Sequence, residues 1–82
     1  LANKLTEIWG QQVLIDNRAG AAGNIGTASA ARNDPDGYTL LLADTGFSTG
    51  ISLYNNVGYH PLKDFLPISL VALTPIVAVV HP

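Results

Sequence analysis

The sequence contains no cysteine and no methionine, and only 12% of its 82 residues are charged. Without cysteine the chain has no disulfide bonds and no thiolate metal site, although this absence does not identify a cellular compartment. The net charge is −2, and the basic residues stand singly as Lys4, Arg18, Arg32 and Lys63. Scattered cations exclude the electrostatic footprint of a protein that binds nucleic acid or anionic lipid.

The sequence also lacks a long uninterrupted apolar run. The longest, residues 65–80, contains Pro67 and Pro75 and is shorter than the ~20 residues that a membrane helix needs, so it is typical of strands. No basic segment followed by an apolar one precedes the first helical pattern at Leu1, so a signal peptide is not visible. We therefore expect that a natural amino terminus has been lost.

The apolar fraction of 48% is too high for a disordered chain and leaves little charge to solvate a small domain. A chain of 82 residues forms one domain at most and buries only about two thirds of the surface that its unfolded form exposes. We therefore expect a single domain over residues 1–82, some of whose apolar residues require a missing partner. The alternative is a compact domain that hides all of them.

Helix and strand patterns alternate along the chain. Apolar residues at helical spacing end at Gly10, which fits a left-handed cap, and the Ala-rich residues 27–32 predict a second helix. Residues 12–16 predict a short strand between the two helices. The Asp-Pro-Asp-Gly turn of residues 34–37 ends the second helix.

The second half of the chain adds three strand candidates. Residues 38–43 predict a strand that is covered on both faces, because its three leucines are consecutive. Residues 44–50 form a loop and residues 51–54 a short helical turn, and the last two strand candidates are 65–73 and 76–80. The order of elements predicts the α/β class, with a partial layered α/β sheet.

The first candidate site is the glycine-rich loop Gly20, Ala21, Ala22 and Gly23, which precedes the second helix. Glycines in that place let backbone N–H groups approach an anion, and a carboxylate would suit the positive end of the helix. The spacing G-x-x-G-x-x-G is neither the dinucleotide motif nor a P-loop, which argues against nucleotide binding. The alternative is that these glycines only permit a tight turn and a close helix contact.

The second candidate site follows the strand 38–43 and consists of Thr45, Gly46 and Ser48. Ligands of open α/β sheets gather at the carboxyl ends of strands, and hydroxyl groups can bind a carboxylate without adding charge. The alternative is an ordinary polar loop that caps a helix through Ser48.

No catalytic or metal-binding constellation is visible. His60 and His81 each stand beside a proline with no acidic residue at ligand-like spacing, and no G-x-S-x-G motif occurs. A small enzyme that holds a phosphate ester in the glycine loop would need a basic or metal-binding partner, which the sequence does not offer. We therefore predict a protein that is not an enzyme and has no cofactor and no metal site.

Several motifs together resemble one family, the Bug or TctC-like receptors of tripartite tricarboxylate transporters. They are VLIDNRAGAAGNIG at 13–26, DPDGYTL at 34–40, Leu53-Tyr54, YHPLKDF at 59–65 and the terminal VVHP at 79–82. Ala22 stands where the family usually has glycine, and His60 stands where it usually has aspartate. The matches cover nearly the whole chain in the right order.

The resemblance implies a two-domain periplasmic receptor with the type II periplasmic-binding-protein fold, which captures a small carboxylate and presents it to a membrane transporter. This chain would be an internal part of lobe 1, without the first strand and without lobe 2. In such receptors backbone amides and hydroxyls, with ordered water, hold the ligand carboxylate. The resemblance implies that Gly20–Gly23 support the pocket and that Thr45, Gly46 and Ser48 line it. The second loop departs from the family, which more often has a His and an Asn near the hydroxyl residue.

A second hypothesis stays open. The chain could be an autonomous structural domain derived from such a receptor, which binds no solute and forms homo-oligomers through exposed strand edges. A stable dimer would favour this hypothesis, and a monomer at all concentrations would count against it.

Overall fold

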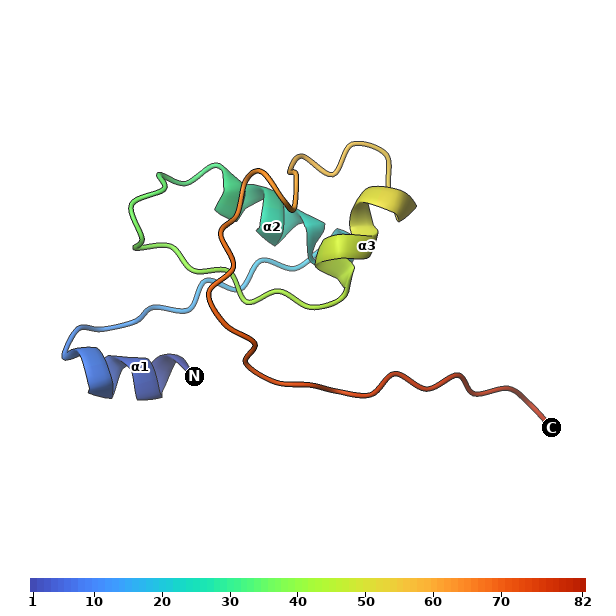
Figure 1. Cartoon of the computed structure of the whole chain (residues 1–82), viewed down its shortest axis with the longest axis horizontal. Helices are drawn as coiled ribbons and strands as arrows, with labels where there is room; N and C mark the ends of the chain where they lie inside the picture. Colours follow the sequence, from blue (N-terminus) through green and yellow to red (C-terminus); the bar gives the residue numbers. More distant parts are fainter.

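The computed structural model describes residues 1–82 and contains three α-helices and one short 3₁₀ turn (Figure 1). These elements are α1 (Ala2–Trp9), η1 (Ala21–Gly23), α2 (Asn24–Ala31) and α3 (Gly46–Leu53). The helices α2 and α3 pack against each other and both contact η1, whereas α1 packs against none of them. Figure 1 shows α1 on one side of this small body and the last residues running away from it as a single chain.

The predicted first helix is confirmed, together with its cap. Gly10 has a φ of 67°, and its N–H donates to the carbonyl oxygen of Thr6 at 3.0 Å. The Thr6 hydroxyl donates to the carbonyl oxygen of Ala2 and accepts a bond from the N–H of Val13, each at 2.9 Å. These bonds tie the chain after the helix back onto α1.

The helix α2 begins earlier than the sequence predicts. We expected a helix over 27–32, but it starts at Asn24, directly after Gly23, whose φ of 88° ends the left-handed loop before it. The Thr27 hydroxyl donates to the carbonyl oxygen of Gly23 at 2.9 Å and ties this first turn together. Small side chains such as Ala28 keep the helix narrow, so other segments can approach it closely.

The prediction of a loop over 44–50 is wrong, because most of it belongs to α3. Asp44 supplies the reason: its carboxylate accepts a hydrogen bond from the N–H of Gly46 at 2.9 Å, and its carbonyl oxygen accepts one from the N–H of Phe47 at 3.1 Å. A capped first turn starts a helix despite the glycines, which disfavour helix interiors. The helix ends at Leu53, where Tyr54 becomes extended.

The predicted α/β fold is wrong, because the chain contains no β-strand and therefore no layered sheet. Of the 24 backbone hydrogen bonds, 14 lie within helices and the other ten close turns and helix ends. None joins two of the four expected strands, which were residues 12–16, 38–43, 65–73 and 76–80. A strand needs a neighbouring backbone, whereas a helix satisfies its own N–H and C=O groups. The apolar pattern of these segments is present, but their pairing is not.

The core is small and partly polar. The buried residues number five and are Asn24, Thr27, Ala28, Gly50 and Tyr59. The accessible surface is 7364 Å², against about 4,700 Å² for a compact protein of 8.6 kDa. The radius of gyration is 14.9 Å, against about 12 Å for a compact chain of this length. The alternative of a compact domain that hides its apolar residues is therefore wrong.

Candidate functional site

The glycine-rich loop forms a run of four consecutive residues with positive φ. The angles are 127° at Gly20, 47° at Ala21, 53° at Ala22 and 88° at Gly23. A left-handed conformation costs an alanine about 1 kcal/mol. An added Cβ at Gly20 would lie 2.6 Å from Cδ1 of Ile25, but this is the end of an exposed side chain that can move, so the positive φ is what favours glycine there. Strained backbone of this kind is a feature of ligand-binding loops.

Three backbone amides of this loop carry no hydrogen bond within the chain. They belong to Gly20, Ala21 and Ala22, whereas the N–H of Gly23 donates to the carbonyl oxygen of Gly20 at 3.0 Å. The loop therefore presents consecutive unpaired donors immediately before the N-terminus of α2. This arrangement can bind an acceptor such as a carboxylate oxygen.

The second predicted loop is mostly occupied by its own hydrogen bonds. The carbonyl oxygen of Thr45 accepts bonds from the hydroxyls of Ser48 and Thr49, at 3.2 and 3.0 Å, and from the N–H of Thr49 at 3.2 Å. The N–H of Gly46 is held by the Asp44 carboxylate. The donors left without a partner are the N–H groups of Thr45 and Ser48 and the hydroxyl of Thr45. Ser48 therefore lies in the first turn of α3 and does not cap it from outside.

The fold brings the two predicted loops together. The helix α3 packs on η1, and a Cβ at Gly46 would lie 3.4 Å from the carbonyl oxygen of Ala22 and 3.0 Å from the Asp44 carboxylate. An added Cβ would make ordinary contact with Ala22 and a tight contact with Asp44, so a small residue favours this approach. The N-terminal ends of α2 and α3 consequently meet at η1 (Figure 1).

Sequence reasoning missed the residues that hold this junction. The hydroxyl of Tyr59 lies 3.1 Å from the Oδ1 atom of Asn24 and 3.0 Å from the carbonyl oxygen of Phe47, and its single proton is shared between these two acceptors. Tyr59 thereby links α2 to α3, although it lies 35 residues after Asn24. A Cβ at Gly50 would lie 2.7 Å from Oδ1 of Asn24 and 3.0 Å from the Tyr59 hydroxyl, so glycine is needed there. The signal was available, since Asn24 and Tyr59 both stand in motifs that carry the family resemblance.

An aromatic cluster supports the same junction. The rings of Phe47 and Tyr59 stack with centroids 5.7 Å apart, and Phe65 meets both edge-on at 5.2 and 6.2 Å. Such pairs add to the free energy of apolar burial. The segment 59–65 therefore fixes the position of α3 and, through it, of the second loop.

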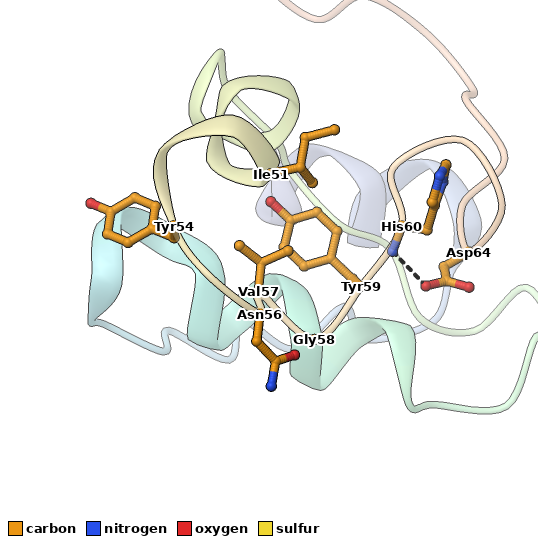
Figure 2. A pocket seen from close by; sticks show the side chains of 8 residues that line it. All are labelled: Ile51, Tyr54, Asn56, Val57, Gly58, Tyr59, His60 and Asp64. Carbon is orange, nitrogen blue, oxygen red and sulfur yellow. Dashed lines mark hydrogen bonds between the residues drawn. The ribbon is translucent and has the colours of Figure 1, made fainter.

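Two open hollows flank the body, and neither coincides with the predicted site. The first, of about 450 Å³, contains none of its residues and is lined by Ile51, Tyr54, Asn56, Val57, Gly58, Tyr59, His60 and Asp64 (Figure 2). The second, of about 320 Å³, contains Ala21 alone among the predicted site residues. The predicted loops thus form a surface of donors and not the floor of a deep pocket.

His60 serves the turn at one end of the first hollow. Its N–H donates to the Asp64 carboxylate at 2.7 Å (Figure 2), and its ring Nδ1 accepts from the N–H groups of Leu62 and Lys63 at 3.2 and 3.3 Å. These bonds close the turn. No group of three potential metal ligands is present in the chain. None of the helices combines the length and the apolar character needed to cross a membrane.

Comparison with known proteins gives one family. The sequence model of the tripartite tricarboxylate transporter family receptor, TctC, matches residues 1–82. A UPF0065 protein in the TAR-I ttuE-ttuC' intergenic region of Agrobacterium vitis is 42% identical over 96% of this chain and 23% of its own length. Protein BugT of Bordetella pertussis is 43% identical over 100% of this chain and 26% of its own length.

The chain spans about a quarter of the length of the curated relatives it matches. A UPF0065 protein in the tcbD-tcbE intergenic region of Pseudomonas sp. is 41% identical over 98% of this chain and 24% of its own length. No solved structure matches this chain.

Proposed function

Because the chain belongs to the TctC family of tripartite tricarboxylate transporter receptors, whose members are periplasmic solute-binding proteins, we propose that it supplies part of a carboxylate-binding surface. In this proposal the solute is a small carboxylate in the periplasm, and a membrane transporter receives it. The chain performs no catalysis and needs no cofactor. Its contribution is a set of neutral hydrogen-bond donors.

The observation that carries the proposal is the set of unpaired amides where η1 meets α3. Gly20, Ala21 and Ala22 offer three free N–H groups, and Ser48 offers a fourth from the first turn of α3. An ionised carboxylate is an acceptor only, and its bonds to N–H groups are charge-assisted and therefore strong. The nearby ends of α2 and α3 add positive potential.

Asp44 lies close to this surface. Its carboxylate holds the N–H of Gly46 at the start of α3 and would repel a second anion placed directly beside it. In this proposal the solute carboxylate binds to the amides of Ala21 and Ala22, and the charge of Asp44 opposes that binding. The unpaired hydroxyl of Thr45 can donate to the same ligand.

A thermal-shift titration of the chain with mono-, di- and tricarboxylates tests the proposal. We expect a saturable stabilisation by at least one carboxylate, since a ligand that binds only the folded state stabilises it. Thr45→Val should abolish that stabilisation because it removes the free hydroxyl and keeps the side-chain shape. The matched control is Thr49→Val, whose lost hydroxyl bonds only to the carbonyl oxygen of Thr45.

Three results decide the test. Ligand-specific stabilisation that survives Thr49→Val and disappears in Thr45→Val supports the proposal. The same loss in both variants would show that helix stability, and not a ligand contact, was measured. No stabilisation by any carboxylate would refute the proposal for this chain.

Self-assembly without solute binding is the second candidate function. Association through strand edges is excluded as its basis, because no strand forms. Apolar side chains such as Leu66, Ile68 and Val79 are nevertheless 79–88% exposed. Exposed apolar surface of this extent favours association. Sedimentation over a range of concentrations tests it, and a monomer throughout would exclude it.

A further inference from the structure

The second hollow lies between α2 and the segment 54–57. The α2 wall is formed by Asn24, by Ala28 and by Arg32, which follows the last residue of the helix. Residues four apart on a helix share one face, so these three side chains form a single stripe. The volume of about 320 Å³ is enough for a small organic ligand.

Asn24 contributes an unused hydrogen-bond donor to this hollow. The residue is only 7% exposed, and its Oδ1 atom is taken by the Tyr59 hydroxyl. Its Nδ2 group forms no hydrogen bond in the chain. Every fully buried side-chain nitrogen or oxygen of the chain does have a hydrogen-bond partner. The Nδ2 group is therefore not fully buried, and Asn24 lines this hollow.

Arg32 brings a positive charge to the same place. Its guanidinium forms no ion pair and no hydrogen bond, unlike that of Arg18, which bonds to Asp16 and Ser29. Arg32 follows Ala28 by one helical turn, and both residues line the hollow together with Asn24. No acidic residue lines the hollow. The charge is therefore available to a ligand.

We propose that this hollow binds a small carboxylate, held by the Arg32 guanidinium and the Asn24 amide, at a site that shares only Ala21 with the loop pair. The planar fork of arginine matches the two oxygens of a carboxylate, and the amide adds a neutral donor. Ala28 leaves the space between them open, since its side chain is a single methyl group. None of Thr45, Gly46 and Ser48 lines this hollow, so the site does not depend on the second loop.

The test is a titration of the isotopically labelled chain with succinate, followed through the Asn24 side-chain amide signals and the α2 backbone amides by NMR. We expect saturable shifts in the unmodified chain. Arg32→Gln should weaken binding about tenfold, as for the loss of one charge-assisted hydrogen bond. The control Lys63→Gln removes the same charge from a residue that lines neither hollow, and it should leave binding unchanged.

Two more variants complete the design. Asn24→Asp keeps the oxygen that accepts from Tyr59 but loses the free donor and adds a negative charge, so succinate binding should disappear. Thr45→Val should leave it intact, which separates this site from the loop pair. The proposal is overturned if no saturable shift occurs at α2, if Lys63→Gln weakens binding as much as Arg32→Gln, or if Thr45→Val abolishes it.

Discussion

At the scale of single residues, one hydrogen-bonded group organises the body of the molecule. The Tyr59 hydroxyl, the Asn24 side chain and the main chain of Gly50 and Phe47 meet within hydrogen-bonding or van der Waals distance. Glycine at 50 is therefore needed for space and not for backbone freedom. The space at Gly46 is less restricted, because an added Cβ there would lie 3.4 Å from the carbonyl oxygen of Ala22.

We predict that Gly50→Ala destabilises the chain by about 1–3 kcal/mol, the usual range for overpacking. The direction of the change in unfolding free energy distinguishes overpacking from helix propensity, because glycine to alanine in an unhindered helix interior stabilises by roughly 0.5–1 kcal/mol. The added Cβ would lie 2.7 Å from Oδ1 of Asn24. Urea unfolding followed by circular dichroism measures the difference.

The matched control for this prediction is Thr49→Ala, an exposed position in the same helix, which should change the unfolding free energy by less than about 0.5 kcal/mol. If Gly50→Ala proved as stable as the unmodified chain, Asn24 and Tyr59 would have to be farther from Gly50 than in this structure.

At the scale of elements, α3 exists because of a residue outside it. Its sequence contains two glycines and two β-branched residues, so its intrinsic helix propensity is low. The Asp44 carboxylate at the N–H of Gly46 and packing on α2 and η1 compensate for this.

Asp44→Ala should therefore destabilise the chain by about 1 kcal/mol, the usual effect of losing a cap. Asp44→Asn should restore most of the loss, because the amide oxygen can accept the same bond. Asp34→Ala is the control, since the Asp34 side chain forms no hydrogen bond or ion pair. Thermal unfolding would compare the three variants, and equal effects of Asp44→Ala and Asp34→Ala would contradict the capping role.

The elements also show what sequence reasoning could and could not predict. The helix that ends at Gly10 and the helix after the glycine loop were foreseen, because caps and propensity act within a few residues. The predicted sheet does not form, because strand pairing depends on segments that are distant in the chain. The apolar pattern of residues 38–43 is the same whether or not a neighbouring strand is present. The convergence of Gly46 on Ala22 depends likewise on Tyr59, far along the sequence.

At the scale of the whole molecule, the chain exposes roughly 2,700 Å² more surface than a compact protein of its mass. The excess includes the exposed side chains of Leu14 and Leu42. It also includes the carboxyl-terminal segment, which runs away from the body in Figure 1. The part with mutual packing consists mainly of α2, α3, η1 and the segment 59–65, with Arg18 and Gly58 also against α2. Such a chain is expected to bind hydrophobic surfaces wherever it meets them.

The separation of α1 from the other helices has a consequence for spectroscopy. The only tryptophan, Trp9, lies on α1 and is 54% exposed, whereas the buried chromophore of the body is Tyr59. Tryptophan fluorescence will therefore report the fraying of one isolated helix, and near-ultraviolet dichroism of the tyrosines will report the body. We predict two different midpoints of thermal unfolding, with the tryptophan signal changing first; coincident curves would mean that α1 and the body melt as one cooperative unit.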